Sequence, residues 1–150
     1  MKTALIVLAI LFGGWLLFIF GLKGMASLLR KSTAKAAMAA LSNEAILRLT
    51  ENASFLGADF PGPNLPPRTS GTLAVTETKV LFLPWFPRRS ITLPVHTIAG
   101  VGLKNELGNM AYNIPVLVLN IKGVGDPYGS MAWLVHEPEE WKHIIKSILE

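Results

Sequence analysis

The chain has 150 residues, of which 51% are hydrophobic, and its formal net charge is +4. This length allows one domain of ordinary size plus an attachment, and the composition is too apolar for a disordered protein. There is no cysteine, which excludes disulfides, a thiolate nucleophile and zinc bound by cysteine.

The positive charge is concentrated at the N-terminal end of the chain. Residues 1–43 contain five Lys/Arg and no acid, whereas residues 44–150 contain nine Lys/Arg and ten Asp/Glu. The larger part of the chain is therefore close to neutral. Because binding to a phosphate backbone requires a basic face, we expect no nucleic-acid partner.

The N-terminal stretch TALIVLAILFGGWLLFIFGL, residues 3–22, carries no charge. As a helix it would cover about 30 Å, which is the thickness of the hydrocarbon layer of a bilayer. We predict a transmembrane helix with short flanks at 1–23. The alternative is a cleaved secretory signal ending near Gly24-Met25-Ala26, although the apolar region of such signals is usually about 7–15 residues long.

Basic residues on the two flanks of this stretch predict its orientation. Lys2 precedes it, whereas Lys23, Arg30, Lys31 and Lys35 follow it. The flank with more Lys and Arg tends to stay in the cytoplasm. We therefore predict a single-pass protein of the cell membrane whose C-terminal domain is cytoplasmic.

The next segment, 24–43, is rich in Ala, Leu, Met and Lys and favours a helix. It is predicted to be a juxtamembrane helical linker. Two interpretations of its basic residues stay open at this point. They can contact anionic lipid headgroups, or the helix can be a spacer surrounded by solvent.

From residue 44 onwards the pattern changes from helical to stranded. Strands are expected at 45–57, 71–76, 79–84, 90–94, 98–105, 116–123 and 131–136. Between them we expect a tight turn at Glu77-Thr78, a proline-rich loop at 58–71, a second loop at 106–115 and a turn at 124–130.

The chain closes with an amphipathic helix that begins near Pro138. Its apolar stripe consists of Trp141, Ile144, Ile145, Ile148 and Leu149. A stripe with this spacing must be buried against another element. Seven short strands with turn signals between them indicate a barrel or a sandwich. The open end of a small barrel would be a natural place for the helix to pack.

Three stretches of the sequence carry a resemblance: GTLAVTETKVLFLPWF, SITLPVHTIAGVG and EPEEWKHIIKSIL. Together they resemble a GRAM-type, pleckstrin-homology-like domain of a membrane-anchored, bacterial type. GTLAVTETKVLFLPWF resembles the opening strands of that family, with their Gly-x-Leu-x-Val-Thr pattern. SITLPVHTIAGVG is similar to its Ile-x-x-Pro-x-x-x-Ile-x-x-Val segment, and EPEEWKHIIKSIL to its closing helix. The resemblance covers residues 44–150.

The resemblance implies a seven-stranded bent sheet capped by a helix, and a binding or tethering module in place of an enzyme. It carries over no functional residue. Family members that bind phosphoinositides use several Lys/Arg across their first two strands and the joining loop. Here that region offers only Arg48 and Arg68, with Glu51 and Asp59 beside them, so the resemblance does not extend to phosphoinositide recognition.

The residues themselves give no sign of catalysis, of a metal or of another cofactor. His96, His136 and His143 form no metal-binding motif, and the chain has no nucleophile elbow and no phosphate-binding glycine loop. The neighbouring Glu139 and Glu140 are accounted for by the positive end of the last helix dipole. We therefore predict that the protein is not an enzyme and holds no metal or cofactor.

The stretch LPWFPRRS, residues 83–90, is the candidate contact surface. Trp85 or Phe86 should point into the fold and the other outward, because neighbouring strand residues face opposite ways. In one interpretation Trp85 and Phe86 are only hairpin packing, and Arg88 and Arg89 are solvated. In the other, these four residues contact lipid headgroups.

These observations predict a non-catalytic module that recruits or scaffolds a protein partner at the membrane and can contact anionic lipid. A domain dedicated to lipid headgroups and a structural subunit of a membrane complex are the alternatives. The juxtamembrane basic residues Lys23, Arg30, Lys31 and Lys35 are the second set of candidate contact residues.

Overall fold

The computed structural model describes residue 21 and residues 23–60, 65, 68–86, 89–107, 109–124 and 128–150. Within these residues, no helix is both long enough and apolar enough to cross a bilayer. The predicted transmembrane helix, residues 3–22, lies outside the described residues except for Gly21, so it stays a prediction.

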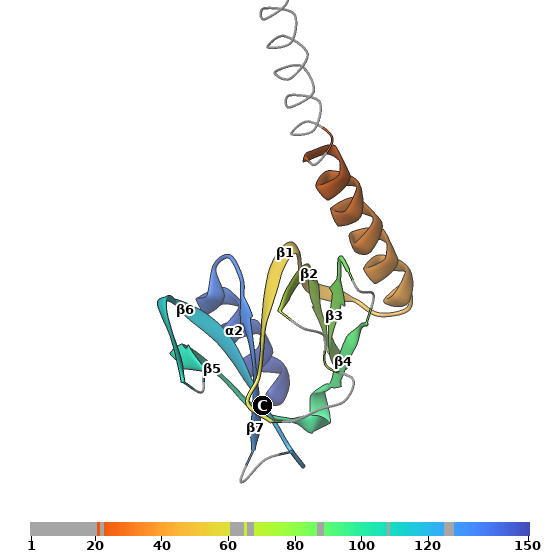
Figure 1. The fold of residues 1–150 in the computed structure, drawn as a ribbon. Helices are drawn as coiled ribbons and strands as arrows, with labels where there is room; N and C mark the ends of the chain where they lie inside the picture. The colour runs from red at the N-terminus through yellow and green to blue at the C-terminus, as the bar shows by residue number, and fades with distance from the viewer. Residues whose placement is uncertain are drawn as a thin grey trace, which may run out of the picture.

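The described chain contains an N-terminal helix, seven strands and a C-terminal helix (Figure 1). The N-terminal helix covers residues 23–40. The strands are β1 (Ile46–Ala58), β2 (Thr69–Thr76), β3 (Lys79–Pro84), β4 (Ile91–Pro94), β5 (Ile98–Leu107), β6 (Met110–Ile121) and β7 (Gly129–Leu134). A short 3₁₀ helix, η1 (Val95–Thr97), precedes β5, and α2 (Pro138–Leu149) closes the chain.

All seven strands form one antiparallel sheet in the order β4-β3-β2-β1-β7-β6-β5. The long strand β1 belongs to both halves, because Ile46 to Phe55 pair with β2 and Ser54 to Ala58 pair with β7. Its pairing is irregular between Thr50 and Ala53, and β-bulges of this kind bend a strand. The sheet therefore folds over on itself. The predicted fold class, mainly β with a C-terminal helix, is confirmed.

The core lies between the two halves of the sheet and is closed by α2. The rings of Phe55, Phe82 and Trp133 pack together at its centre, with centroids 5.3–6.2 Å apart. From α2, Trp141 and Ile145 are fully buried against this core. The alternation of the strands and the stripe of the last helix thus point inward as their sequence patterns predict.

One element was assigned wrongly from the sequence. The expected loop at 106–115 is instead the end of β5 and the start of β6, joined by a tight turn around residue 109. Gly108, Asn109 and Pro115 are typical of loops. Pro115 is tolerated in β6 because the pairing with β5 is irregular there, so the proline removes no regular ladder bond.

Candidate functional site

The N-terminal helix packs on the outer face of β2 and β3. Ala34 and Ala37 are buried on one side of this helix, and Leu41 is buried just after its end. Ala37 and Leu41 form a cluster with Ala74 and Leu81 of the two strands. Small side chains allow the helix to approach the sheet closely. One face of the segment 24–43 is therefore covered by the domain. Its basic residues are exposed, so both interpretations of those residues stay open.

A pair of buried hydroxyls joins the helix to β2. Thr72 donates a hydrogen bond to Thr33 across the contact, with 3.0 Å between the two oxygens. The Thr33 hydroxyl in turn lies 3.0 Å from the backbone oxygens of Leu29 and Arg30. Both threonines are buried, so each hydroxyl depends on these partners for its hydrogen bonding.

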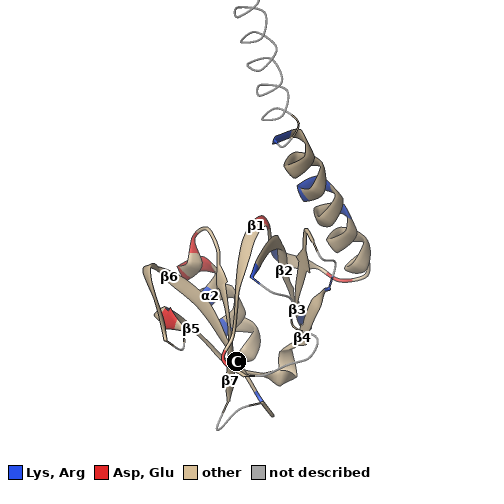
Figure 2. Cartoon of the chain, viewed as in Figure 1, with Lys and Arg blue, Asp and Glu red and all other residues tan. Residues whose placement is uncertain are grey.

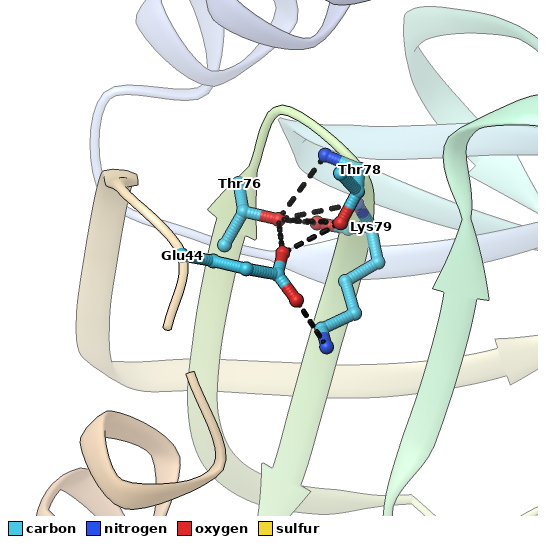
Figure 3. A network of polar contacts seen from close by, with 4 residues as sticks. All are labelled: Glu44, Thr76, Thr78 and Lys79. Carbon is cyan, nitrogen blue, oxygen red and sulfur yellow. Dashed lines mark hydrogen bonds and ion pairs between the residues drawn. The ribbon is translucent and has the colours of Figure 1, made fainter. Parts of the chain in front are cut away.

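Just beyond the helix, Glu44 fastens the chain to the turn between β2 and β3 (Figure 3). Its carboxylate accepts hydrogen bonds from Thr76 at 2.6 Å and Thr78 at 2.5 Å, and its other oxygen lies 2.6 Å from the Lys79 ammonium. The contact with Lys79, followed by those with Thr76 and Thr78, lowers the pKa of Glu44 to about 2.

These contacts define the direction of the helix relative to β3. Arg30, near the beginning of the helix, meets Trp85 just after β3, whereas Glu44 meets Lys79 at the start of β3. The helix therefore runs antiparallel to β3. The first turns of the helix extend away from the sheet, as Figure 1 shows. They do so on the side of the domain where β3 is connected to β4.

That connection contains the candidate aromatic residues. Trp85 is half-buried, and the Arg30 guanidinium lies over its ring at 5.1 Å from the centroid. Phe86 points away and is 78% exposed. The backbone of the connection is held by the Trp85 amide, which donates to the Ser70 carbonyl, and by the Thr69 hydroxyl, which donates to the Phe86 carbonyl, each at 2.9 Å.

The structure brings the two sets of candidate contact residues together. Lys23, Lys31 and Lys35 are exposed on the helix, and Arg89, three residues after Phe86 in the chain, is also exposed. Figure 2 shows basic residues along the described part of the N-terminal helix. Arg88 lies outside the described residues. The contact between Arg30 and Trp85 makes the helix and the β3–β4 connection one surface. Sequence reasoning missed this pairing, because no local pattern links residues so far apart in the chain.

A separate groove lies on the other half of the sheet, beside the β5–β6 hairpin. Its volume is about 740 Å³, and it is lined by Asp59, Leu103, Lys104, Asn105, Glu106, Leu107, Ala111, Tyr112 and Ser130. The hairpin is held over β1 by Arg68, which donates to the Leu56 carbonyl at 3.0 Å and to the Tyr112 hydroxyl. No residue of the N-terminal helix lines this groove.

Arg48 of β1, one of the two basic residues of the first two strands, contacts the beginning of α2. Its guanidinium forms ion pairs with Glu137 and Glu140 and lies 5.5 Å from the centre of the Trp141 ring. Although burial opposes its charge, the hydrogen bonds that Arg48 donates to Glu140 and Glu137 raise its pKa. This arginine ties β1 to the beginning of α2 and is not available to a ligand.

Within the part of the chain that the structure describes, no three His, Asp or Glu side chains gather into a group that could hold a metal ion. His96, His136 and His143 are all exposed and belong to different segments. The predictions that the protein is not an enzyme and holds no cofactor are not tested by these facts and stay predictions.

Comparison with known proteins identifies the fold. No family model matches the chain, and no curated protein matches it. The N-terminal PH domain of Vps36 is similar in structure, with a TM-score of 0.52 and 13% identity over 72% of this chain and 80% of that one.

Two further solved structures are similar at the same level. One is the C-terminal domain of an unknown protein from Leishmania infantum, with a TM-score of 0.54 and 9% identity over 80% of this chain and 98% of that one. The other is a chain of the 8S snRNP assembly intermediate, with a TM-score of 0.50 and 12% identity over 69% and 81%. At these identities the likeness shows the fold alone, which is pleckstrin-homology-like. Membership of the GRAM family stays a resemblance in sequence.

Proposed function

We propose that the protein is a membrane-anchored, non-catalytic module whose pleckstrin-homology-like domain recruits a protein partner at the cytoplasmic face of the membrane. The observation that carries this proposal is the docked N-terminal helix. A flexible linker would let the domain sample every orientation. A helix held to β2 and β3 by buried alanines, Leu41 and the Thr33–Thr72 hydrogen bond fixes the domain relative to the predicted span.

The groove beside the β5–β6 hairpin is the surface that we assign to the partner. It lies on the half of the sheet that the helix leaves free, and its lining combines apolar Leu103, Leu107 and Tyr112 with charged Lys104 and Glu106. Interfaces of this kind bury an apolar centre inside a polar rim. A domain held in one orientation keeps this groove at one fixed direction relative to the membrane. A partner bound in the groove would therefore also be held in one orientation at the membrane.

The test uses the complete chain in its native membrane and exploits the absence of cysteine. A single cysteine is placed at the exposed groove position by Asn105→Cys and carries a short photo-crosslinker. Thr92→Cys, at an exposed position on the edge strand β4, is the matched control. We expect a discrete cross-linked species from position 105 and none from position 92, and Tyr112→Ala should weaken it.

Cross-linking at both positions or at neither contradicts recruitment through the groove. The orientation is checked with Glu77→Cys, because this exposed turn residue should react with an impermeant maleimide only after the cells are opened. Reaction in intact cells contradicts the cytoplasmic placement.

A further inference from the structure

The aromatic connection between β3 and β4 lies at a defined distance from the predicted span. Arg30, which contacts Trp85, comes eight residues after the last residue of the span, Leu22. In a helix this corresponds to about 12 Å along the axis. The headgroup layer extends about 5–7 Å beyond the hydrocarbon on each side. With the helix continuing into the predicted span, Phe86 would lie within a side chain's reach of the headgroups.

The same end of the molecule exposes apolar side chains that the domain does not need for its own packing. Phe86 is the most exposed large hydrophobic residue of the described chain, at 78%. Leu28 and Met25, on the part of the helix before the docked region, follow at 70% and 58%. Exposed apolar residues that gather at one end of a molecule indicate an interaction site.

The charge of this end is positive. The helix contributes Lys23, Arg30 and Lys31, and the connection contributes Arg89. Residues 21–43 contain no acid. An apolar tip surrounded by cations matches the surface of an anionic bilayer, where aromatic rings enter the interface and cations meet phosphates.

We propose that Met25, Leu28, Arg30, Trp85, Phe86 and Arg89 form one membrane-proximal surface that contacts an anionic bilayer, with Phe86 inserted among the headgroups. The contact rests on the predicted span of the proposed function but not on the protein partner. Together with the docked helix it gives the domain a second point of attachment. Two attachments fix the tilt of the domain and therefore the direction in which the groove faces.

The test reconstitutes the complete chain into vesicles. Ser90→Cys places a unique cysteine at an exposed position of the connection while Trp85, Phe86 and Arg89 are kept. It is labelled with an environment-sensitive fluorophore in vesicles whose acyl chains carry bromine, a contact quencher. Glu77→Cys is the matched control, because this exposed turn lies at the opposite end of β3, about 20 Å away by strand length.

We expect blue-shifted, quenched emission from position 90 in vesicles containing phosphatidylserine, and water-like, unquenched emission from position 77. Adding Phe86→Ser should abolish the quenching. Adding Arg89→Ser should weaken the contact about fivefold, in line with the contribution of one basic residue near an anionic surface. High salt should act in the same direction.

Water-like emission at position 90, from a chain that resists extraction with alkaline carbonate, overturns the membrane contact and leaves the anchoring intact. Extraction of the chain by carbonate overturns the anchored function itself and this proposal with it. Equal quenching in purely phosphatidylcholine vesicles overturns the role given to the basic residues.

Discussion

The two helices of the described chain rest on the same sheet in different ways. The helix α2 inserts Trp141 and Ile145 into the core between the two halves of the sheet. The N-terminal helix lies on the outside of β2 and β3 and buries mainly alanines and a threonine pair. The contact of α2 forms part of the domain core, whereas the contact of the N-terminal helix joins the domain to the N-terminal segment.

This difference follows from the size and shape of the buried side chains. Large aromatic and aliphatic groups bury much apolar area and make α2 part of the cooperative fold. Alanines bury little area and give a close but weak contact. The position of the N-terminal helix is therefore determined mainly by the contact of Arg30 with Trp85 near its beginning and that of Glu44 with Lys79 just after its end. Variants of the two helices should therefore separate global stability from local docking.

The largest effect is expected from Trp141→Ala. The indole is fully buried against the core and also lies beside Arg48, so its removal should lower the free energy of unfolding by about 3–5 kcal/mol. Thermal unfolding of the detergent-solubilised chain, followed by near-ultraviolet circular dichroism, measures this loss. His143→Ala, at an exposed neighbouring position, should change the stability by less than about 0.5 kcal/mol.

A smaller effect is expected from Leu41→Ala on the other helix. Leu41 is buried on Ala74 and Leu81, and its truncation should cost about 2 kcal/mol at the docking contact. Hydrogen exchange of the helix amides should accelerate while the melting temperature of the domain stays nearly constant, since the helix can detach locally. Met38→Ala, which alters an exposed side chain, serves as the control. If the domain melts together with the helix, the distinction between the two contacts is wrong.

The hydrogen bond between Thr33 and Thr72 should show coupling in a double-mutant cycle. Thr33→Val leaves the buried Thr72 hydroxyl without its acceptor, and one unpaired buried group costs about 1–3 kcal/mol. Combining Thr33→Val with Thr72→Val removes both hydroxyls and should cost less than the sum of the two single changes. Hydrogen exchange across 30–41 measures each corner of the cycle. Additive effects would show that the two hydroxyls do not depend on each other.

Most strands of the sheet and the closing helix could be predicted from the sequence because their signals are local. Alternating apolar residues predicted the strands, and the two-residue spacing at Glu77-Thr78 predicted the β2–β3 turn. The apolar stripe that contains Trp141 and Ile145 predicted α2. The β5–β6 hairpin was missed because Pro115 is read as a loop residue unless the pairing irregularity around it is known.

The docked helix could not be predicted in the same way. Ala34, Ala37 and Leu41 recur at helical spacing, but alanines are as common on solvated helices as on packed ones. Their partners on β2 and β3 come from a part of the chain whose position depends on the whole sheet. The contact of Arg30 with Trp85 likewise depends on how the helix lies on the sheet. The candidate surface therefore could not be predicted from the sequence alone.

The smallest effect is expected at the junction fastened by Glu44, and it depends on pH. The folded protein lowers the pKa of this carboxyl from 4.5 to about 2, so the folded form favours the ionised carboxylate. The stabilisation is complete above about pH 4.5 and is lost as the pH falls towards 2. Because other carboxyls titrate in the same range, the readout must be local. Exchange of the Thr78 and Lys79 amides should quicken over this window.

Glu44→Gln should make that exchange fast at neutral pH and remove its dependence on Glu44 protonation, since an amide cannot pair with the Lys79 ammonium as a carboxylate does. Glu77→Gln, in the same turn, should keep the pH dependence because the contacts of Glu44 stay in place. If both variants behave alike, the turn is held by its own backbone, and the helix is attached to the sheet only by its other contacts.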